Sequence, residues 1–260
     1  MQAVIQIRGL QVQYDEIPVL KGIDLEVSQG EILGYIGPNG AGKTTTVKAL
    51  IGLLTDFDGE IRVCGIDVRE DPLGVKRRIG YVPESAALYE ALTPMEHLAF
   101  VGRMHGMPLE TVATRSRQLL DLVGLADQTG LAMAGFSKGM RQKVLILAAL
   151  LHDPDVLLLD EPLSGLDANS AVTMKEVFGR LAAAGKTVFY CSHVMEVVER
   201  LCHRIAILSD GEVVANGPFE ELQSMAQAHT LEHLFTQLTS EGQHEEVAAE
   251  VVRVLTADVP

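Results

Sequence analysis

Apolar and polar residues alternate along the first thirty positions of the chain. The apolar members of this pattern are Val4, Ile5, Ile7, Leu10, Val12, Ile23, Leu25 and Val27. A period of two is typical of strands with one buried face, so residues 2–30 are predicted to form antiparallel strands. A shorter alternation at 59–68 predicts a further strand pair.

Continuous apolar runs mark a second kind of strand, one that is buried on both faces. Such runs lie at 31–36, 79–83, 156–161, 187–191 and 204–208. Helices are predicted at 45–53, 109–123, 137–151 and 168–184, and a capping box at Thr93 and Glu96 begins another. The mixture predicts an α/β protein in which residues 85–152 form a helical insertion between two strands of one sheet.

One glycine-rich stretch stands between a predicted buried strand and a predicted helix. It reads Gly37-Pro38-Asn39-Gly40-Ala41-Gly42-Lys43-Thr44, which fits the pattern of a phosphate-binding loop. Glycines let backbone N–H groups turn toward an anion, Lys43 brings a positive charge to the β- and γ-phosphates, and Thr44 offers a hydroxyl to Mg²⁺. The alternative is a surface turn, but the pattern arises by accident in roughly one chain of this length in a hundred.

Composition narrows the classes of protein. The chain has 260 residues, of which 47% are hydrophobic, and its formal net charge is −14. One large domain with a core is expected, and the charge argues against a broad nucleic-acid footprint or a polybasic membrane patch. The longest apolar run, 144–151, is far too short for a bilayer, residues 1–10 do not resemble a signal peptide, and the three cysteines lack metal-site spacing. We expect a cytosolic protein with reduced thiols.

Candidate chemistry also lies at the ends of three other predicted elements. Asp160 and Glu161 close a buried strand, where an Asp can hold Mg²⁺ through its water shell and a Glu can orient or deprotonate an attacking water. Ser137 and Gly139 open an apolar helix whose N-terminus is either a second anion site or a plain serine N-cap. For Tyr14, the pattern alone favours an ordinary edge-strand tyrosine over one that stacks on a nucleobase.

These stretches, with Ser164-Gly165-Leu166-Asp167 and His193, occur in the order seen in ATP-binding-cassette (ABC) ATPases. The resemblance covers about residues 2–220 and implies a P-loop NTPase ABC-ATPase fold with a RecA-like core, an antiparallel β subdomain and a helical subdomain, binding ATP and Mg²⁺. Lys43, Glu161 and His193 match the catalytic residues, and the Mg²⁺ ligands match Thr44, Glu84 and Asp160. The residues that match the nucleotide contacts are Tyr14, Gly37, Pro38, Asn39, Gly40, Ala41, Gly42, Lys43, Thr44, Thr45, Ser137, Lys138, Gly139, Met140 and Asp167.

In this family the signature helix that begins at Ser137 contacts ATP held by a neighbouring copy. The resemblance therefore implies that two copies, or this chain and a paralogue, enclose two ATP molecules head to tail. Lys138 and Met140 depart from the usual signature, where a Gly and a Gln stand, and Glu84 replaces a Gln that touches Mg²⁺ and faces the membrane subunit. Both forms resemble the exporter subgroup, so the implied partner is a separate integral membrane permease, with this subunit at the inner face of the cell membrane.

We expect residues 1–240 to form the nucleotide-binding domain and 241–260 a short acidic tail. A non-transport ABC ATPase acting on DNA or the ribosome is the alternative; such proteins usually carry coiled coils, zinc insertions or a second cassette, which this sequence does not contain. A nucleotide kinase or GTPase is disfavoured, because neither function would explain the residues at 137–142 or His193. The pattern of His229, Glu232 and His233 fits a zinc-protease motif, but outside that motif's structural context.

Overall fold

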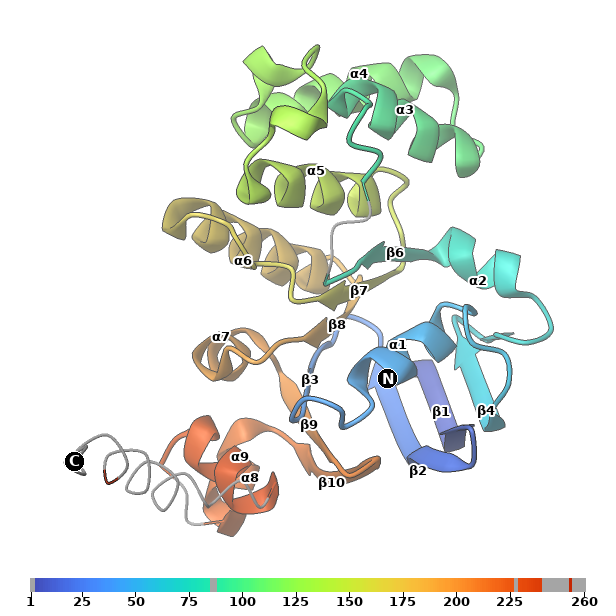
Figure 1. The fold of residues 1–260 in the computed structure, drawn as a ribbon, viewed down its shortest axis with the longest axis vertical. Helices are drawn as coiled ribbons and strands as arrows, with labels where there is room; N and C mark the ends of the chain where they lie inside the picture. The colour runs from blue at the N-terminus through green and yellow to red at the C-terminus, as the bar shows by residue number, and fades with distance from the viewer. Residues whose placement is uncertain (1–2, 85–87, 227–228, 240–252, 254–260) are drawn as a thin grey trace, which may run out of the picture.

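The computed structural model describes residues 3–84, 88–226, 229–239 and 253, and two β-sheets with helices packed against them make up its body (Figure 1). The smaller sheet is antiparallel, in the order β2-β1-β4-β5. Its strands are β1 (Ala3–Tyr14), β2 (Ile17–Ser28), β4 (Asp58–Val63) and β5 (Ile66–Asp67). Ile5 lies opposite Val27 and Leu10 opposite Ile23, and all four side chains are buried. This pairing confirms the antiparallel strands predicted at 2–30 and 59–68.

The larger sheet has the order β10-β9-β3-β8-β7-β6 and is parallel except where β10 pairs with β9. Its strands are β3 (Ile32–Ile36), β6 (Ile79–Val82), β7 (Val156–Asp160), β8 (Thr187–Cys191), β9 (Arg204–Ser209) and β10 (Glu212–Gly217). Every residue of β3, β7 and β8 is buried, because helices or the smaller sheet cover both faces. Burial on both faces explains their continuous apolar runs.

The described helices pack on both faces of the larger sheet and in a separate layer. They are α1 (Lys43–Leu50), α2 (Pro72–Arg78), α3 (Pro94–Met104), α4 (Leu109–Leu122), α5 (Lys138–Leu150), α6 (Ala168–Ala183), α7 (Met195–Leu201), α8 (Phe219–Ala226) and α9 (Leu231–Thr239). Helix α1 shares one hydrophobic cluster with the smaller sheet, whereas α6, α7 and α9 pack against the opposite face of the larger sheet. An antiparallel sheet, a largely parallel sheet and helices in a separate layer are the parts that the sequence predicts.

Helices α3, α4 and α5, which we call the helical layer, lie between β6 and β7 in the chain and at the top of Figure 1. They have a hydrophobic cluster of their own, in which Leu98, Val112, Leu120 and Val144 are fully or almost fully buried. The predicted capping box begins α3: the Thr93 hydroxyl accepts the Glu96 N–H, and the Glu96 carboxylate accepts the Thr93 N–H. This layer occupies the region expected for the helical insertion.

Some predicted boundaries were wrong, and two short helices were not predicted. The helix expected at 45–53 runs from Lys43 to Leu50, because Gly42 caps its start with a left-handed φ of 109° and the chain turns again at Gly52. Helices α2 and α7 have seven residues each, too few for a clear helical period. The Asp71–Pro72 pair, a cap followed by a proline, is a signal that could have located α2.

The described residues also bear on membrane segments and on the C-terminal part of the chain. Among them, no helix is both long and apolar enough to cross a membrane. The acidic tail expected at 241–260 lies outside the described residues except for Arg253.

Candidate functional site

The phosphate-binding loop joins the end of β3 to the start of α1. Gly42 needs its glycine identity, because its φ is positive and a Cβ there would lie 2.4 Å from a methyl carbon of Leu20. Lys43 Nζ donates to the carbonyl oxygens of Gly37 (2.5 Å) and Pro38 (3.0 Å). The lysine therefore folds back onto its own loop, where its charge and the free N–H groups of the first turn of α1 can act together on an anion.

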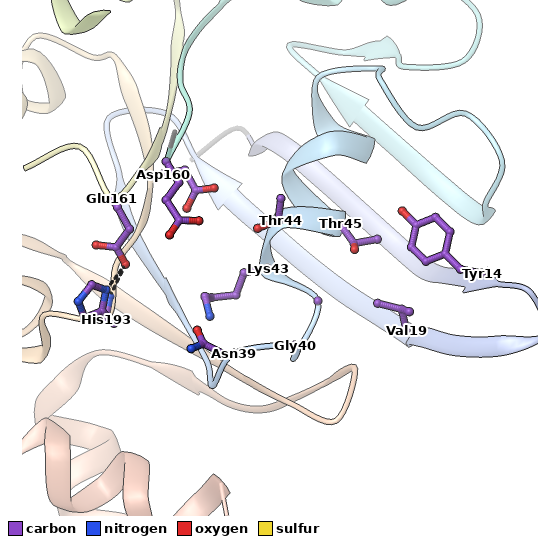
Figure 2. A pocket seen from close by; sticks show the side chains of 12 residues that line it. Tyr14, Val19, Asn39, Gly40, Lys43, Thr44, Thr45, Asp160, Glu161 and His193 are labelled. Atoms are coloured by element: carbon purple, nitrogen blue, oxygen red, sulfur yellow. Dashed lines mark hydrogen bonds and ion pairs between the residues drawn. The ribbon is translucent and has the colours of Figure 1, made fainter. Parts of the chain in front are cut away.

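A cavity of about 340 Å³ opens beside this loop (Figure 2). It is bounded by the smaller sheet on one side and by the carboxyl ends of β7 and β8 on the other. Its lining residues are Tyr14, Val19, Asn39, Gly40, Gly42, Lys43, Thr44, Thr45, Glu84, Asp160, Glu161 and His193. With the exception of Val19, every one of these was a candidate from the sequence. Including Val19, the lining residues come from six separate stretches of chain.

Asp160 is the last residue of β7 and is only 5% exposed. Burial, followed by the nearby carboxylates of Glu84 and Glu161, raises the pKa of Asp160 from 3.8 to about 6, and Lys43 offsets part of this. The negative charge of Asp160 is therefore under-compensated by the protein. A cation in the cavity would relieve that deficit.

Glu161 is held in place by three donors from the end of β8. Its Oε1 accepts hydrogen bonds from the backbone N–H of His193 (2.7 Å) and from His193 Nδ1 (2.6 Å). Its Oε2 accepts a hydrogen bond from the Ser192 hydroxyl (2.9 Å). Its own φ of 49° is unusual for a residue other than glycine. The carboxylate is nearly buried, whereas the His193 ring is 77% exposed at the cavity edge. Ser192 was missed as a site residue, because nothing in its local sequence points at Glu161.

Tyr14 lies at the opposite end of the cavity from Glu161 and His193 (Figure 2). It is the last residue of β1, and 44% of it is exposed. Val19, from β2, lines the same end of the cavity. An exposed aromatic ring beside an apolar side chain offers a surface on which a flat ring can stack. Val19 was also missed, because alternation in β2 marks it only as one of many apolar strand residues.

Several predicted nucleotide contacts do not line this cavity. Gly37 and Pro38 face Lys43 through their carbonyls, and Ala41 is buried. Ser137, Lys138, Gly139 and Met140 lie at the start of α5, and Asp167 at the start of α6.

Ser137 and Asp167 are N-caps, accepting the N–H groups of Met140 and Ser170. The structure therefore shows the cap at Ser137, and an anion site at the start of this helix stays a prediction. This serine lies outside the cavity of its own chain.

The zinc-protease motif is not assembled. His229 precedes α9, so it does not share a helix face with His233, whose Nε2 instead lies 3.1 Å from Gln237 Nε2. Across the described part of the chain, no group of three or more His, Cys, Asp and Glu side chains is placed to hold a metal ion. A magnesium ion at Asp160 would thus need ligands from a bound phosphate as well as from the protein, which is how Mg²⁺ is usually held.

The sequence was also compared with known proteins. Residues 20–164 match the family model described as ABC transporter. An uncharacterised ABC transporter ATP-binding protein of Nostoc sp. is 45% identical over 208 residues, which cover 78% of this chain and 61% of that protein. A Nod factor export ATP-binding protein I of Cupriavidus metallidurans is 35% identical over 222 residues, which cover 85% of this chain and 73% of that protein.

Solved structures of ABC ATP-binding proteins share the fold of this chain. One described as the ATP-binding subunit of an ABC transporter has a TM-score of 0.85 at 32% identity, covering 90% of this chain and 99% of its own. A dimeric ATP-binding cassette, MJ0796, in a post-hydrolysis state bound to ADP and Pi, has a TM-score of 0.76 at 25% identity, covering 82% of this chain and 98% of its own. Because the family model covers more than half of the chain and these relatives align over most of it, the chain belongs to the ABC transporter family, as an ATP-binding subunit.

Proposed function

We propose that this chain is the ATP-hydrolysing subunit of an ABC exporter, working with a separate membrane permease. The observation that carries the proposal is that Lys43, Thr44, Asp160, Glu161 and His193 all line one cavity of the chain. It combines a phosphate-binding loop, an under-compensated carboxylate and a fixed carboxylate beside a histidine. Those are the parts that hydrolysis of a phosphoanhydride requires.

Binding of ATP would use both ends of the cavity. The adenine would stack on Tyr14, and the β- and γ-phosphates would lie at the loop, held by Lys43 and by backbone N–H groups. Thr44, Asp160 and Glu84 are the residues that would hold Mg²⁺. Burial and neighbouring carboxylates raise the pKa of Asp160, and a bound cation would lower it again by stabilising the ionised carboxylate. When bound, Mg²⁺ would supply positive charge that stabilises the negative charge developing on the phosphates.

Glu161 would act as the general base. Its three donors hold the carboxylate at one end of the cavity, where it can accept a proton from a water that attacks the terminal phosphate. His193 contacts Glu161 through Nδ1, and its ring stays exposed at the cavity edge, so it can sense the same phosphate. The two residues therefore act as one unit, with the histidine positioned by the base.

We propose further that two copies, or this chain and a paralogue, enclose two ATP molecules. Ser137 and Gly139 lie at the exposed start of α5 rather than in the cavity of their own chain, so the nucleotide they would contact is one held by the partner. The dimeric cassette structures support this arrangement. Asp167, at the start of α6, would then lie at the boundary between the two copies.

The transport role is supported by the names of relatives, which include a Nod factor export ATP-binding protein. The permease would dock on the helical layer near Glu84, so that closure of the two copies around ATP moves it. This would hold the subunit at the inner face of the cell membrane. The cargo would be chosen by the permease.

The test replaces Glu161 with Gln, which keeps the side-chain shape but removes the base. We expect ATP turnover to fall at least about 100-fold, since a general base contributes that much or more. ATP should then hold the variant as a dimer in size-exclusion chromatography, because the enclosed nucleotide is no longer consumed. Glu176→Gln, an exposed site on α6, serves as the control and should change neither measurement. Unchanged turnover in Glu161→Gln would refute the assignment of the base, and a monomer at every ATP concentration would refute the enclosure.

A further inference from the structure

The start of α5 is packed against the loop that joins β7 to α6. We call the loop between β7 and α6, residues 161–167, the catalytic loop, because it begins at Glu161 and ends at Asp167. The two segments are separated by more than twenty residues in the chain. The contacts between them involve Lys138, one of the two residues at which the helix departs from the usual signature of the family.

Lys138 contacts the catalytic loop with both parts of its side chain. Its Nζ donates to the hydroxyl of Ser164 at 2.8 Å. Its aliphatic stem lies against Gly165, which has a φ of 78°, and a Cβ at Gly165 would meet the Cγ and Cδ atoms of Lys138 at 2.8 Å each. A glycine at position 138, as in the usual signature, would provide neither the hydrogen bond nor the packing.

Two further contacts hold the two segments together at the same junction. A Cβ at Gly139 would lie 2.5 Å from the carbonyl oxygen of Gly165, so the helix backbone meets the loop backbone directly. One turn further along α5, Gln142 is 3% exposed, and its Nε2 donates to the carbonyl oxygen of Pro162 at 2.9 Å. Movement of α5 relative to β7 would therefore pull on the catalytic loop at Pro162, Ser164 and Gly165.

Both ends of the catalytic loop are functional positions under the proposed function. At one end, the carboxylate of Glu161 is held by donors from Ser192 and His193. At the other end, Asp167 caps α6 by accepting the Ser170 N–H. A loop fixed at both ends transmits a push in its middle to those ends, because packed segments shift together rather than deform independently.

We propose that Lys138 is a positioning residue for ATP hydrolysis, which couples the helical layer to the catalytic loop of the same chain through Ser164 and Gly165. This rests on the proposed function, in which Glu161 is the base. Lys138 would thus act within its own chain, rather than as a contact to ATP as the family signature suggests for this position. When the helical layer moves with its permease, the lysine carries that movement to the end of β7.

The test is a double-mutant cycle on the full-length chain, read by steady-state ATP hydrolysis. Lys138→Met keeps the aliphatic stem and removes the donor, and Ser164→Ala removes the acceptor. We expect each to lower kcat about fivefold, the size of one exposed hydrogen bond to a charged group, with KM for ATP within about twofold of wild type. The double variant should be no slower than either single variant, because both remove the same bond. Lys138→Arg should recover most of the rate.

Lys175→Met, a half-buried position on α6 that does not line the nucleotide cavity, controls for the loss of a lysine charge and should match wild type. Losses that multiply in the double variant would overturn the proposal. So would a salt-dependent rise in KM in Lys138→Met with kcat unchanged, since that pattern marks direct contact with phosphate. These outcomes would contradict the role of Lys138 alone. The proposed function would be contradicted by a different result, an active Glu161→Gln variant, whatever the outcome of the double-mutant cycle.

Discussion

Replacing Ser192, the residue after β8, with Ala tests whether its hydrogen bond is needed to hold Glu161, the proposed base. The hydroxyl donates to Glu161 Oε2 at 2.9 Å, the serine is 2% exposed, and the side chain of Glu161 is 12% exposed. A hydrogen bond to a charged group that is shielded this well contributes about 2 kcal/mol. If the whole loss falls on the transition state, kcat decreases about 30-fold, since 1.4 kcal/mol corresponds to a factor of about ten.

The substitution also has a cost in stability, which must be separated from the effect on rate. The Ser192 hydroxyl accepts the N–H of Val194 at 3.1 Å, and the loss of that acceptor near the start of α7 should lower the free energy of unfolding by about 1 kcal/mol. The control is Ser209→Ala, a buried serine at the end of β9 whose side chain does not line the cavity. Rates are measured with a coupled ATPase assay over a range of ATP concentrations that gives both kcat and KM, and stability is measured by urea denaturation.

We expect Ser192→Ala to lose rate at unchanged KM, and Ser209→Ala to keep the wild-type rate. A kcat within twofold of wild type for Ser192→Ala would show that the two contacts from His193 hold Glu161 without help, and the role assigned to the serine would be wrong. A rise in KM with constant kcat would be equally damaging, because it would place the serine in nucleotide binding.

Two further predictions follow from other parts of the structure. Tyr14→Ala should raise the dissociation constant for ATP about tenfold, the size of one lost stacking contact. It should leave the melting temperature unchanged because the ring is exposed. Equal affinity for ATP in both proteins would rule out stacking. Burial, and then the stacked ring of His105, lower the pKa of His152 from 6.5 to about 4. Neutral His152 therefore contributes to the free energy of unfolding above pH 6.5, and this contribution is lost as the pH falls toward 4. By pH 5 the loss is about 1 kcal/mol, after halving for solvent screening. Urea denaturation at pH 7 and pH 5 measures this loss, which His152→Gln should reduce; an equal loss in both proteins would contradict the assignment.

Much of the candidate site could be predicted from the sequence because its signals are local. The strand, loop and helix around Lys43 are consecutive, and the caps at Thr93, Ser137 and Asp167 are made by residues three positions apart. A cap or turn that is closed by contacts within a few residues has a geometry set largely by those residues themselves. The order of such motifs along the chain is therefore sufficient to indicate the family.

Other parts of the site could not be predicted, because they depend on distant segments. The bond from Ser192 to Glu161 joins residues 31 positions apart, and the bond from Lys138 to Ser164 joins residues 26 positions apart. Val19 reaches the cavity only because the smaller sheet packs beside the phosphate-binding loop. No local pattern specifies such neighbours, since many strand orders bury the same apolar runs equally well.

The sequence by itself therefore determined the chemistry that this chain carries: a phosphate-binding loop, a carboxylate pair after a buried strand, and a capped helix that follows the family signature. Only the tertiary structure decided that β3, β7 and β8 lie side by side, so that Lys43, Asp160 and Glu161 share one cavity, and that Ser137 lies outside it. The physical reason is the range of the interactions. Helix caps and turns close within four residues, whereas the order of strands is set by the packing of the whole core.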